Sequence, residues 1–437
     1  MRKAHLVLPC ILGLLVGSCF QVNAQVGTCS GCLDGTFGAS GNGLVVTNIG
    51  NTSSAAELAL ESVTQNGVVV QKIVTAVQVS GSSTLFAVTR YNMDGSLDAT
   101  FNGNGILVTN VSGFIYGLAV QSDGKILIMG EAAGVTLLRL NTDGSLDTSF
   151  GSGGMVNIPT TKKVSAGARA IQVQTDGKIV VAGNLGSMGT VWRFTTDGKL
   201  DTSFGSGGAA SISFGNGSTL WPRAVALQNV TVNGNVEQMI VAASNTTIGK
   251  GNNTSAIFAA VRLTPSGRMD ASFGAGGVTS SNFPGLILAL AIDSSNRIVA
   301  VGEANTTGTY VVAAARYSVN GGADASFGSN GYTSFPILTN SHGYAVATQS
   351  DGKTFIGGPT TNIGTPDQMF VARLTTTGAL DGNFGTGGYA MPNFSSFGYN
   401  TGYGYALLLQ PDGKIVLGGA ATVGPSASGI GLARYLP

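Results

Sequence analysis

Residues 139–154 read RLNTDGSLDTSFGSGG, and the pattern in this stretch recurs along the chain. Each copy has an arginine, an aspartate eight residues later, a phenylalanine three residues after that and a glycine four residues further on. The complete pairs are Arg90–Asp98, Arg139–Asp147, Arg193–Asp201, Arg262–Asp270, Arg316–Asp324 and Arg373–Asp381. Arg434 has no following aspartate, and Asp34 has no preceding arginine. These two halves complement each other, so the repeats read as a circle cut open between the chain ends.

A second motif lies midway between these copies. It is clearest at 121–125 (QSDGK), 174–178 (QTDGK), 349–353 (QSDGK) and 410–414 (QPDGK). Asp-Gly between apolar runs predicts a tight β-hairpin. In the repeat from Gly105 to Asp147, the runs 106–111, 117–121, 125–130 and 135–141 predict four strands. Self-similarity at a period of roughly 50–60 residues is typical of a propeller or a solenoid.

The repeats predict an all-β protein, a seven-bladed β-propeller of four-stranded blades closed by pairing of N- and C-terminal segments. The alternative is a β-solenoid, whose end repeats would be capping units rather than complementary halves. We therefore expect Arg434 to lie beside Asp34. Removing the last six residues should lower the stability of the fold far more than removing a free tail would. The truncation exposes the edge of a strand and leaves Asp34 without its arginine.

The arginine–aspartate pairs admit two interpretations. In the structural one, each arginine forks onto its aspartate across the turn, and the phenylalanine packs between neighbouring blades. In the other, the aspartates form a ring of metal-binding or catalytic carboxylates. Identical copies in every repeat favour the structural interpretation, because a functional site usually breaks the symmetry of its scaffold.

Taken together, these motifs resemble the bacterial delta-60 repeat over nearly all of the chain that follows the N-terminal segment. The resemblance implies a propeller-like β domain of a kind that is often exported. It implies no agreed activity, and therefore no catalytic residue. The repeats between Leu200 and Asp324 depart most from the pattern, because they lack the Asp-Gly-Lys hairpin.

The N-terminus predicts export. Met1–Lys3 is basic, 6–16 is apolar and 22–24 (VNA) suits signal-peptide cleavage. Residues 1–24 are then a signal peptide, and 25–437 form a single domain. A lipoprotein signal over 1–18, which would leave a lipidated Cys19, is the rival. The protein would be periplasmic, secreted or anchored to the outer membrane, and Cys19 would be its only link to a membrane.

Composition restricts the chemistry. A net charge of +1 argues against nucleic acid as a partner. We expect no cofactor and no metal, since turns such as Asp94–Asp98 offer too few oxygens for a calcium loop, and we expect a monomer. Cys29 and Cys32 lie in the closure turn, where a local disulfide is plausible after export. Redox chemistry would need a helix N-terminus beside them, and zinc would need more ligands.

Candidate binding residues fall in the loops of one face. The hairpin turns repeat on the other face, whereas these loops vary from blade to blade, and binding residues concentrate in variable loops on a rigid scaffold. The candidates are Tyr116, Trp221, His342, Tyr344, Tyr399 and Tyr403. The alternative is that these aromatic rings have a purely structural role and cover the edge of the hydrophobic core. His342 is the only histidine after the N-terminal segment, which restricts histidine-based catalysis.

The leading hypothesis is an exported, non-enzymatic propeller that binds a glycan or a surface protein through the variable face. The alternative is a propeller hydrolase or lyase with a carboxylate site near the central channel. Acidic residues from several blades converging on one pocket, with a raised pKa among them, would favour the enzyme. If the binding hypothesis holds, Trp221→Ala and Tyr403→Ala should weaken binding and leave folding intact.

Overall fold

A computed structural model describes residues 25–132, 134–159, 166–214, 221–250, 253–306, 308–362, 366–423 and 427–437. The segments predicted as a signal peptide (1–24) or a lipoprotein signal (1–18), with Cys19, lie outside the described residues. Among the described residues, no helix is long and apolar enough to cross a membrane.

The protein is all-β, and its strands form four-stranded antiparallel units. Four of these are separate sheets: β6 (Phe114–Val120), β7 (Ile126–Glu131), β8 (Gly134–Leu140), β9 (Met155–Pro159); β10 (Ala166–Val173), β11 (Ile179–Leu185), β12 (Met188–Phe194), β13 (Ala209–Ile212); β14 (Ala224–Val232), β15 (Asn235–Lys250), β16 (Asn253–Leu263), β17 (Val278–Pro284); and β18 (Leu286–Ile292), β19 (Ile298–Thr306), β20 (Thr309–Tyr317), β21 (Tyr332–Phe335). In a fifth sheet the first strand is split in two: β22 (Asn340–Ser341), β23 (Ala345–Thr348), β24 (Thr354–Thr361), β25 (Gln368–Leu374), β26 (Tyr389–Ala390).

The remaining sheet has eight strands and contains both ends of the chain. One half consists of β2 (Thr52–Gln65), β3 (Val68–Ser80), β4 (Thr84–Tyr91) and β5 (Ile106–Ser112). The other half consists of β27 (Thr401–Leu409), β28 (Ile415–Thr422), β29 (Ser428–Tyr435) and β1 (Leu44–Thr47), with the 3-10 turn Ser395–Phe397 before it. A single parallel bridge, between Thr52 and Ser428, joins the halves. The second half is thus a four-stranded unit made from both termini.

The units are offset from the sequence repeats. The run 106–111 was predicted to open a unit, but it is the last strand of the preceding sheet, β5, because the loop 92–105 brings it back to pair with β4. The chain then crosses to the innermost strand of the next sheet. That prediction of the strand order was wrong, whereas the four-stranded hairpin pattern was right.

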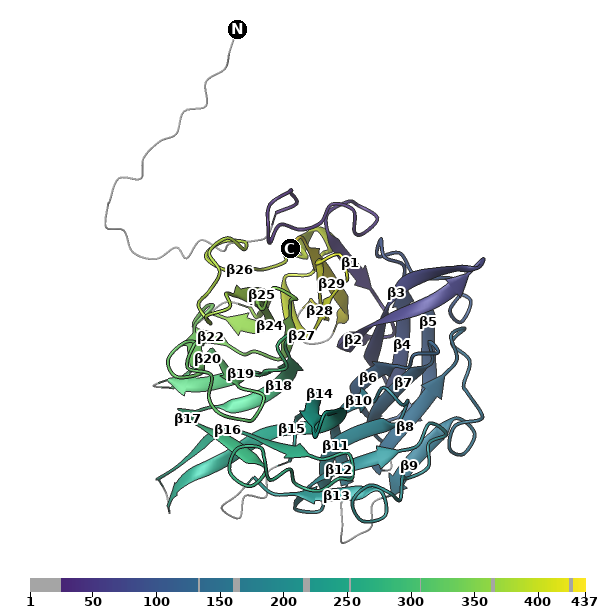
Figure 1. The fold of residues 1–437 in the computed structure, drawn as a ribbon. Coiled ribbons are helices and arrows are strands. Elements are labelled where there is room, and N and C mark those ends of the chain that lie inside the picture. Colours follow the sequence, from purple (N-terminus) through teal and green to yellow (C-terminus); the bar gives the residue numbers. More distant parts are fainter. Residues whose placement is uncertain are drawn as a thin grey trace, which may run out of the picture.

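The first strands of the units lie at the centre of the molecule (Figure 1). β2 contacts β6, β6 contacts β10, β10 contacts β14, and β14 contacts β18. β18 contacts β23, β23 contacts β27, and β27 contacts β2. The innermost strands therefore contact one another in a continuous cycle that returns to its start.

The hairpin motifs behave as their turn chemistry predicts. Gly124 adopts φ 82°, and the Lys125 N–H donates to the Asp123 carboxylate at 3.1 Å. Where the Asp-Gly-Lys motif is missing, β2 and β3 are joined by Asn66 (φ 51°) and Gly67 (φ 77°). Asparagine and glycine both tolerate positive φ, as a two-residue hairpin of this twist requires.

The arginine–aspartate pairs are buried ion pairs, as the structural interpretation predicted. Arg139 Nε donates to Asp147 Oδ2 at 2.7 Å, and its guanidinium lies 4.5 Å from the centre of the Phe150 ring. The same arginine donates to the Thr196 carbonyl in the turn of the next unit. Lys125 of the hairpin motif reaches the same carboxylate at 3.1 Å, which explains why the two motifs recur together. The pairs hold neighbouring units together.

Backbone hydrogen bonds repeat this link from each unit to the next. Their donors and acceptors are Gly38–Asp94, Asn102–Asp143, Gly151–Asp197, Gly205–Ser266, Gly274–Asn320, Gly328–Thr377 and Gly385–Ser30, at 2.7–2.9 Å. Glycine is needed where the partner turn lies against the phenylalanine: a Cβ on Gly198 would meet the Phe150 ring at 2.8 Å. The Gly385–Ser30 bond joins the sheet of β22–β26 to the N-terminal turn. The series of bonds therefore leads back to the N-terminal segment in which it begins.

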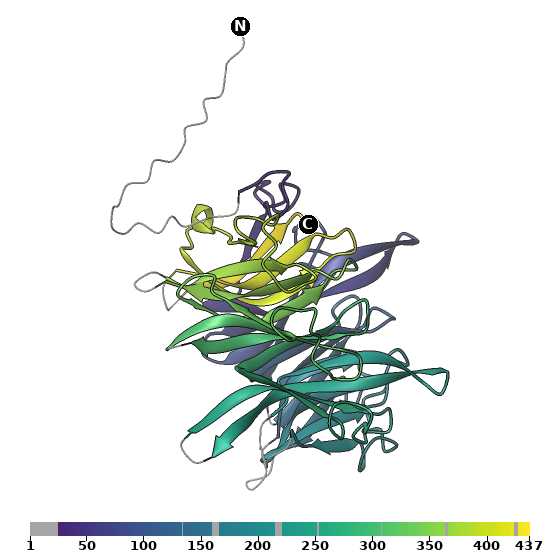
Figure 2. The same ribbon diagram turned by 60° about the vertical axis from the view of Figure 1, so that its left-hand side comes forward.

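The chain ends meet as predicted. Arg434 Nε donates to Asp34 Oδ2 at 2.9 Å, and β29 pairs with β28 on one side and with β1 on the other. The C-terminus lies among the purple N-terminal strands in both views (Figures 1 and 2). Burial raises the pKa of Asp34, but hydrogen bonds from Thr36 and the Arg434 charge outweigh it, so this pKa lies below its usual value.

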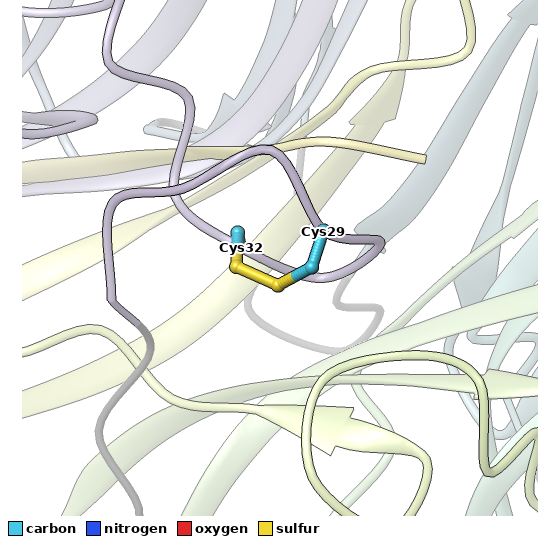
Figure 3. Close-up of a disulfide and its surroundings, with 2 residues drawn as sticks. All are labelled: Cys29 and Cys32. Carbon is cyan, nitrogen blue, oxygen red and sulfur yellow. A yellow bond between two sulfur atoms is a disulfide. The ribbon is translucent and has the colours of Figure 1, made fainter. Parts of the chain in front are cut away.

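The closure turn carries a disulfide between Cys29 and Cys32 (Figure 3). The Cys32 N–H donates to the Cys29 carbonyl at 3.0 Å, so the bond spans a single turn. In the corresponding turn before Asp147, the Asp143 carboxylate accepts from the Ser145 N–H at 2.8 Å instead. The disulfide therefore stands where other units use a side-chain hydrogen bond.

Candidate functional site

A cavity of about 740 Å³ lies between the innermost strands and is lined by residues in or directly before β2, β6, β10, β14, β18, β23 and β27. We call it the central cavity. Its wall is mostly Ala, Leu, Ile and Val, with polar side chains at a few positions. More than half of the surface that faces the cavity is nevertheless polar. The cavity shares its concave form and convergent polar groups with small-molecule sites, but not their largely apolar lining.

A β-bulge near the start of the innermost strands sets which side chains reach the central cavity. The register shifts by one residue in β2, β6, β10, β18 and β27. Arg223 and Tyr344 hold the equivalent positions directly before β14 and β23. Their N–H groups donate to the Ala243 and Gly357 carbonyls of the neighbouring strands, each at 2.9 Å. A bulge re-aims a side chain. The seven bulge residues, which we call the bulge ring, all line the cavity: Ala56, Tyr116, Arg169, Arg223, Leu288, Tyr344 and Tyr405.

The residues of the bulge ring differ from unit to unit, whereas the arginine–aspartate ion pairs are the same in every unit. Arginine and aspartate recur in every unit, whereas the seven equivalent ring positions carry four kinds of side chain: Ala, Tyr, Arg and Leu. In ring order, Arg169 and Arg223 come from adjacent units, and Tyr344 and Tyr405 come from another adjacent pair. Along the innermost strands, Leu288 separates the two pairs on one side, and Ala56 and Tyr116 separate them on the other. One side of the opening is therefore cationic and the other aromatic.

On the cationic side the two arginines differ in their partners. Arg169 lies 4.2 Å from the centre of the Tyr116 ring and pairs with the Glu131 carboxylate at 2.5 Å. Arg223 is exposed, and no ion pair to it occurs among the described residues. Arg169 is thus held by the protein, whereas Arg223 presents an uncompensated charge to the opening.

The aromatic side is a stack of tyrosine rings. Tyr344 and Tyr405 lie 6.0 Å apart between ring centres at an angle of 12°, and Tyr405 and Tyr403 lie 6.3 Å apart at 11°. His342 continues the row, 5.8 Å from Tyr344, and its Nδ1 bonds the Glu303 carboxylate. A hydrogen bond with Asp367, together with burial, raises the pKa of Tyr403 to about 12. The three tyrosines are neutral at physiological pH, and their rings are nearly parallel.

Glu57 is the carboxylate that lines the central cavity. It directly follows the bulge residue of β2, and the corresponding residues of the other units are all Gly or Ala: Gly117, Ala170, Ala224, Ala289, Ala345 and Ala406. Its one hydrogen bond is from the Leu58 N–H at 3.4 Å. Glu57 is half-buried in the cavity wall, and the loss of solvent there raises its pKa to about 7.

Replacing Glu57 should make stability less dependent on pH. The folded carboxyl keeps its proton up to pH about 7, whereas the unfolded carboxyl releases it near 4.5. Folding therefore loses stability as pH rises between these two values. Glu57→Gln should raise the free energy of unfolding by about 1–3 kcal/mol at pH 8 and leave it unchanged at pH 4.5. Urea denaturation at both pH values measures this, and an equal effect at both would contradict it.

The structure divides the predicted site residues into two groups. Tyr116 and Tyr344 line the central cavity, and His342 and Tyr403 extend the ring row beside it. Trp221 is 44% exposed and does not line the cavity. Tyr399 donates to Asn48 at 2.7 Å and lines a separate pocket of about 190 Å³. The last two are not brought together with the others.

Sequence reasoning missed Arg169, Arg223, Tyr405 and Glu57 as site residues. An alignment of the innermost strands on their bulges would have found Glu57, since six of the seven positions are small. The sequence analysis named two features that would favour an enzyme. The first, a carboxyl with a raised pKa, is present in the cavity as Glu57. The second, acidic residues from several units in one pocket, does not occur among the described residues of the cavity wall. Among the described residues, no group of three or more His, Cys, Asp or Glu could hold a metal ion.

Five segments of the chain match a family described as a domain of unknown function (DUF5122) that forms a β-propeller: residues 72–101, 121–150, 174–204, 349–384 and 410–437. No curated protein matches the chain. Similar solved structures include a protein of unknown function from Dyadobacter fermentans, with 10% identity, 90% of this chain and 97% of that chain covered and a TM-score of 0.44. An aldose sugar dehydrogenase from Streptomyces coelicolor has 14% identity, coverage of 75% and 96%, and a TM-score of 0.40.

Similarity at this level carries no argument about activity. The matched segments each contain a copy or a half-copy of the two sequence motifs, so the family match and the repeats describe the same feature. Five segments of the chain, which together make up less than half of its length, are therefore similar to repeats of a β-propeller family.

Proposed function

We propose that the chain is an exported seven-bladed β-propeller that binds a glycan at the opening of its central cavity. The blade count is supported by seven four-stranded units whose innermost strands contact one another in a cycle. Closure is supported by the Gly385–Ser30 hydrogen bond and by the pairing of β29 with β1. The central cavity is then the channel of the propeller.

Export is supported by two independent features. The first is the basic and apolar character of residues 1–24. The second is the Cys29–Cys32 disulfide, because disulfides persist in oxidising compartments and are rare in the cytosol. Lipidation of Cys19 would place the same domain on a membrane surface and leave the proposed site unchanged.

The observation that carries glycan binding is the asymmetry of the bulge ring. Tyr344 and Tyr405 offer nearly parallel, half-buried rings at the edge of a cavity, and amphipathic rings of this kind suit a ligand with one apolar and one polar face. A sugar ring has both faces. A surface protein would need a broader apolar contact than this opening supplies.

Tyr344→Ala and Tyr405→Ala should each weaken binding of the glycan about 5- to 30-fold, because truncating a central aromatic contact costs about 1–2 kcal/mol. Phe114→Ala is the control, since Phe114 is 58% exposed and does not line the cavity. Affinity electrophoresis or calorimetry against the best ligand from a glycan array measures the loss. Equal loss in all three variants, or none in the tyrosine variants, would contradict the proposed site. Tyr403→Ala should also weaken binding, because the Tyr403 ring stacks on Tyr405. Trp221 does not line the cavity, so the sequence-based expectation for Trp221→Ala does not carry over to this site.

A glycan hydrolase or lyase is the second candidate, and Glu57 favours it. A carboxyl whose pKa is raised to about 7 suits a general acid or base at neutral pH. Incubation of bound glycans with the protein, followed by chromatography of the products, separates the two functions. Cleavage that disappears in Glu57→Gln would establish the enzyme, and binding without products would establish the binding protein.

A further inference from the structure

We propose that the ligand of the central cavity is an acidic glycan, whose sugar rings carry a carboxylate that Arg223 binds. This inference rests on the proposed function and narrows it to one chemical class. It starts from the arrangement of charge around the opening rather than from the tyrosine rings that carry glycan binding itself.

The position of Arg223 suits a carboxylate. Its backbone N–H is fixed by the Ala243 carbonyl at 2.9 Å, directly before β14, so the side chain starts from a rigid strand end. The guanidinium is exposed and has no carboxylate partner among the described residues. The buried arginines of the repeats, such as Arg139, all have an aspartate. A planar guanidinium binds a carboxylate through two parallel hydrogen bonds, which gives both strength and orientation.

Arg169 supports the same specificity from the adjacent unit. Its charge is balanced by Glu131, and its planar group is held against Tyr116, so it is fixed in place at the wall. Arg169 therefore lies on the cationic side of the opening, but Arg223 is the arginine available to bind a ligand carboxylate. The Arg223 charge acts on Tyr344 across the opening, where it lowers a phenol pKa that burial and Glu303 raise. Arg223, Tyr344 and Tyr405 all line the same cavity of about 740 Å³, so one ligand there can contact both sides.

The geometry therefore assigns a separate contact to the ring and to the carboxylate of a bound sugar. The ring stacks on Tyr344 and Tyr405, and the carboxylate points across the opening to Arg223. Neutral sugars would keep the stacking and lose the ion pair. Glu57, the other charged group on the wall, holds its proton below pH 7 and then adds no repulsion. Tyr116 and Arg169 complete the titratable groups that face the cavity.

The test compares matched acidic and neutral sugars at pH 6. Oligomers of galacturonate, glucuronate and mannuronate are each measured beside their methyl esters, which keep the backbone and remove the charge. We expect each bound acid to bind at least 10-fold tighter than its ester. Arg223→Gln should remove that preference and leave the affinity for the ester within about 2-fold. Arg268→Gln, which removes an exposed arginine from the hairpin-turn face, should change neither.

The outcomes separate the two proposals. Equal binding of acids and esters would overturn the acidic ligand and leave glycan binding standing. Preference for the acids that survives in Arg223→Gln would also overturn the assignment. Binding of no acid and no ester, while neutral glycans bind, would refute the acidic class alone. Failure of every glycan to bind would refute both proposals.

Discussion

A chain that lacks its last six residues is expected not to fold. This truncation removes Leu432, Arg434 and Tyr435, which are at most 3% exposed, from the strand between β28 and β1. It also leaves the Asp34 carboxylate buried without its arginine. Each large apolar side chain contributes about 1.5–3 kcal/mol. The Asp34 carboxylate keeps Lys414 at 3.2 Å, so losing Arg434 adds a smaller cost to this. The sum is comparable with the 5–15 kcal/mol that typically stabilises a whole domain.

Far-ultraviolet circular dichroism and size-exclusion chromatography of the truncated protein measure this directly. Deletion of Pro437 alone is the control, since that residue is exposed and follows the last strand. We expect the control to melt within a few degrees of the full chain, because surface changes typically stay within about 0.5 kcal/mol. A truncated protein with a native melting curve would show that the C-terminal strand does not close the domain.

Arg90→Met is expected to cost about 3–5 kcal/mol of unfolding free energy, the cost of breaking a buried pair from one side. Arg90 is 1% exposed and binds the carboxylates of Asp98 at 2.9 Å and Glu61 at 3.1 Å. Its removal leaves Glu61 buried with no arginine. Arg268→Met is the control for loss of an exposed arginine and should stay within about 0.5 kcal/mol of the wild type.

The neighbouring repeats supply a second variant. Gln121 stands where Glu61 stands, and it bonds Arg139 at 3.4 Å. Adding Glu61→Gln to Arg90→Met removes the stranded charge and should recover part of the loss, which would reveal the coupling between the two sites. Urea denaturation of the four proteins completes the cycle. A loss below 1 kcal/mol in Arg90→Met would show that these ion pairs do not hold the units together.

The fold was largely readable from the sequence because its motifs perform packing tasks that are the same in every unit. The Arg139–Asp147 spacing fixes a turn, an ion pair and a link to the next unit, and each repeat must satisfy all three. The strand order within a unit was not readable. Residues 106–111 follow one turn motif and precede another, and only the hydrogen bonds decide to which sheet β5 belongs.

The candidate site was less predictable for the opposite reason. Tyr116 and Tyr344 were named because the sequence analysis placed them in variable loops, but Tyr116 lies in strand β6 and Tyr344 lies directly before β23. Arg169 was not named because it lies in an Ala-Arg-Ala stretch with no motif. Its direction depends on a bulge of one residue, and a shift of one residue turns a side chain to the other face of a strand. Glu57 was hidden in the same way within the long strand β2.

The most direct test of the account is a crystal structure of the protein with the tightest-binding acidic oligosaccharide. We predict a sugar ring stacked on Tyr344 and Tyr405 at the opening of the central cavity, with its carboxylate bonded to Arg223. A ligand bound at Trp221, in the pocket beside Tyr399 or on the hairpin-turn face would contradict the assignment of the cavity as the functional site.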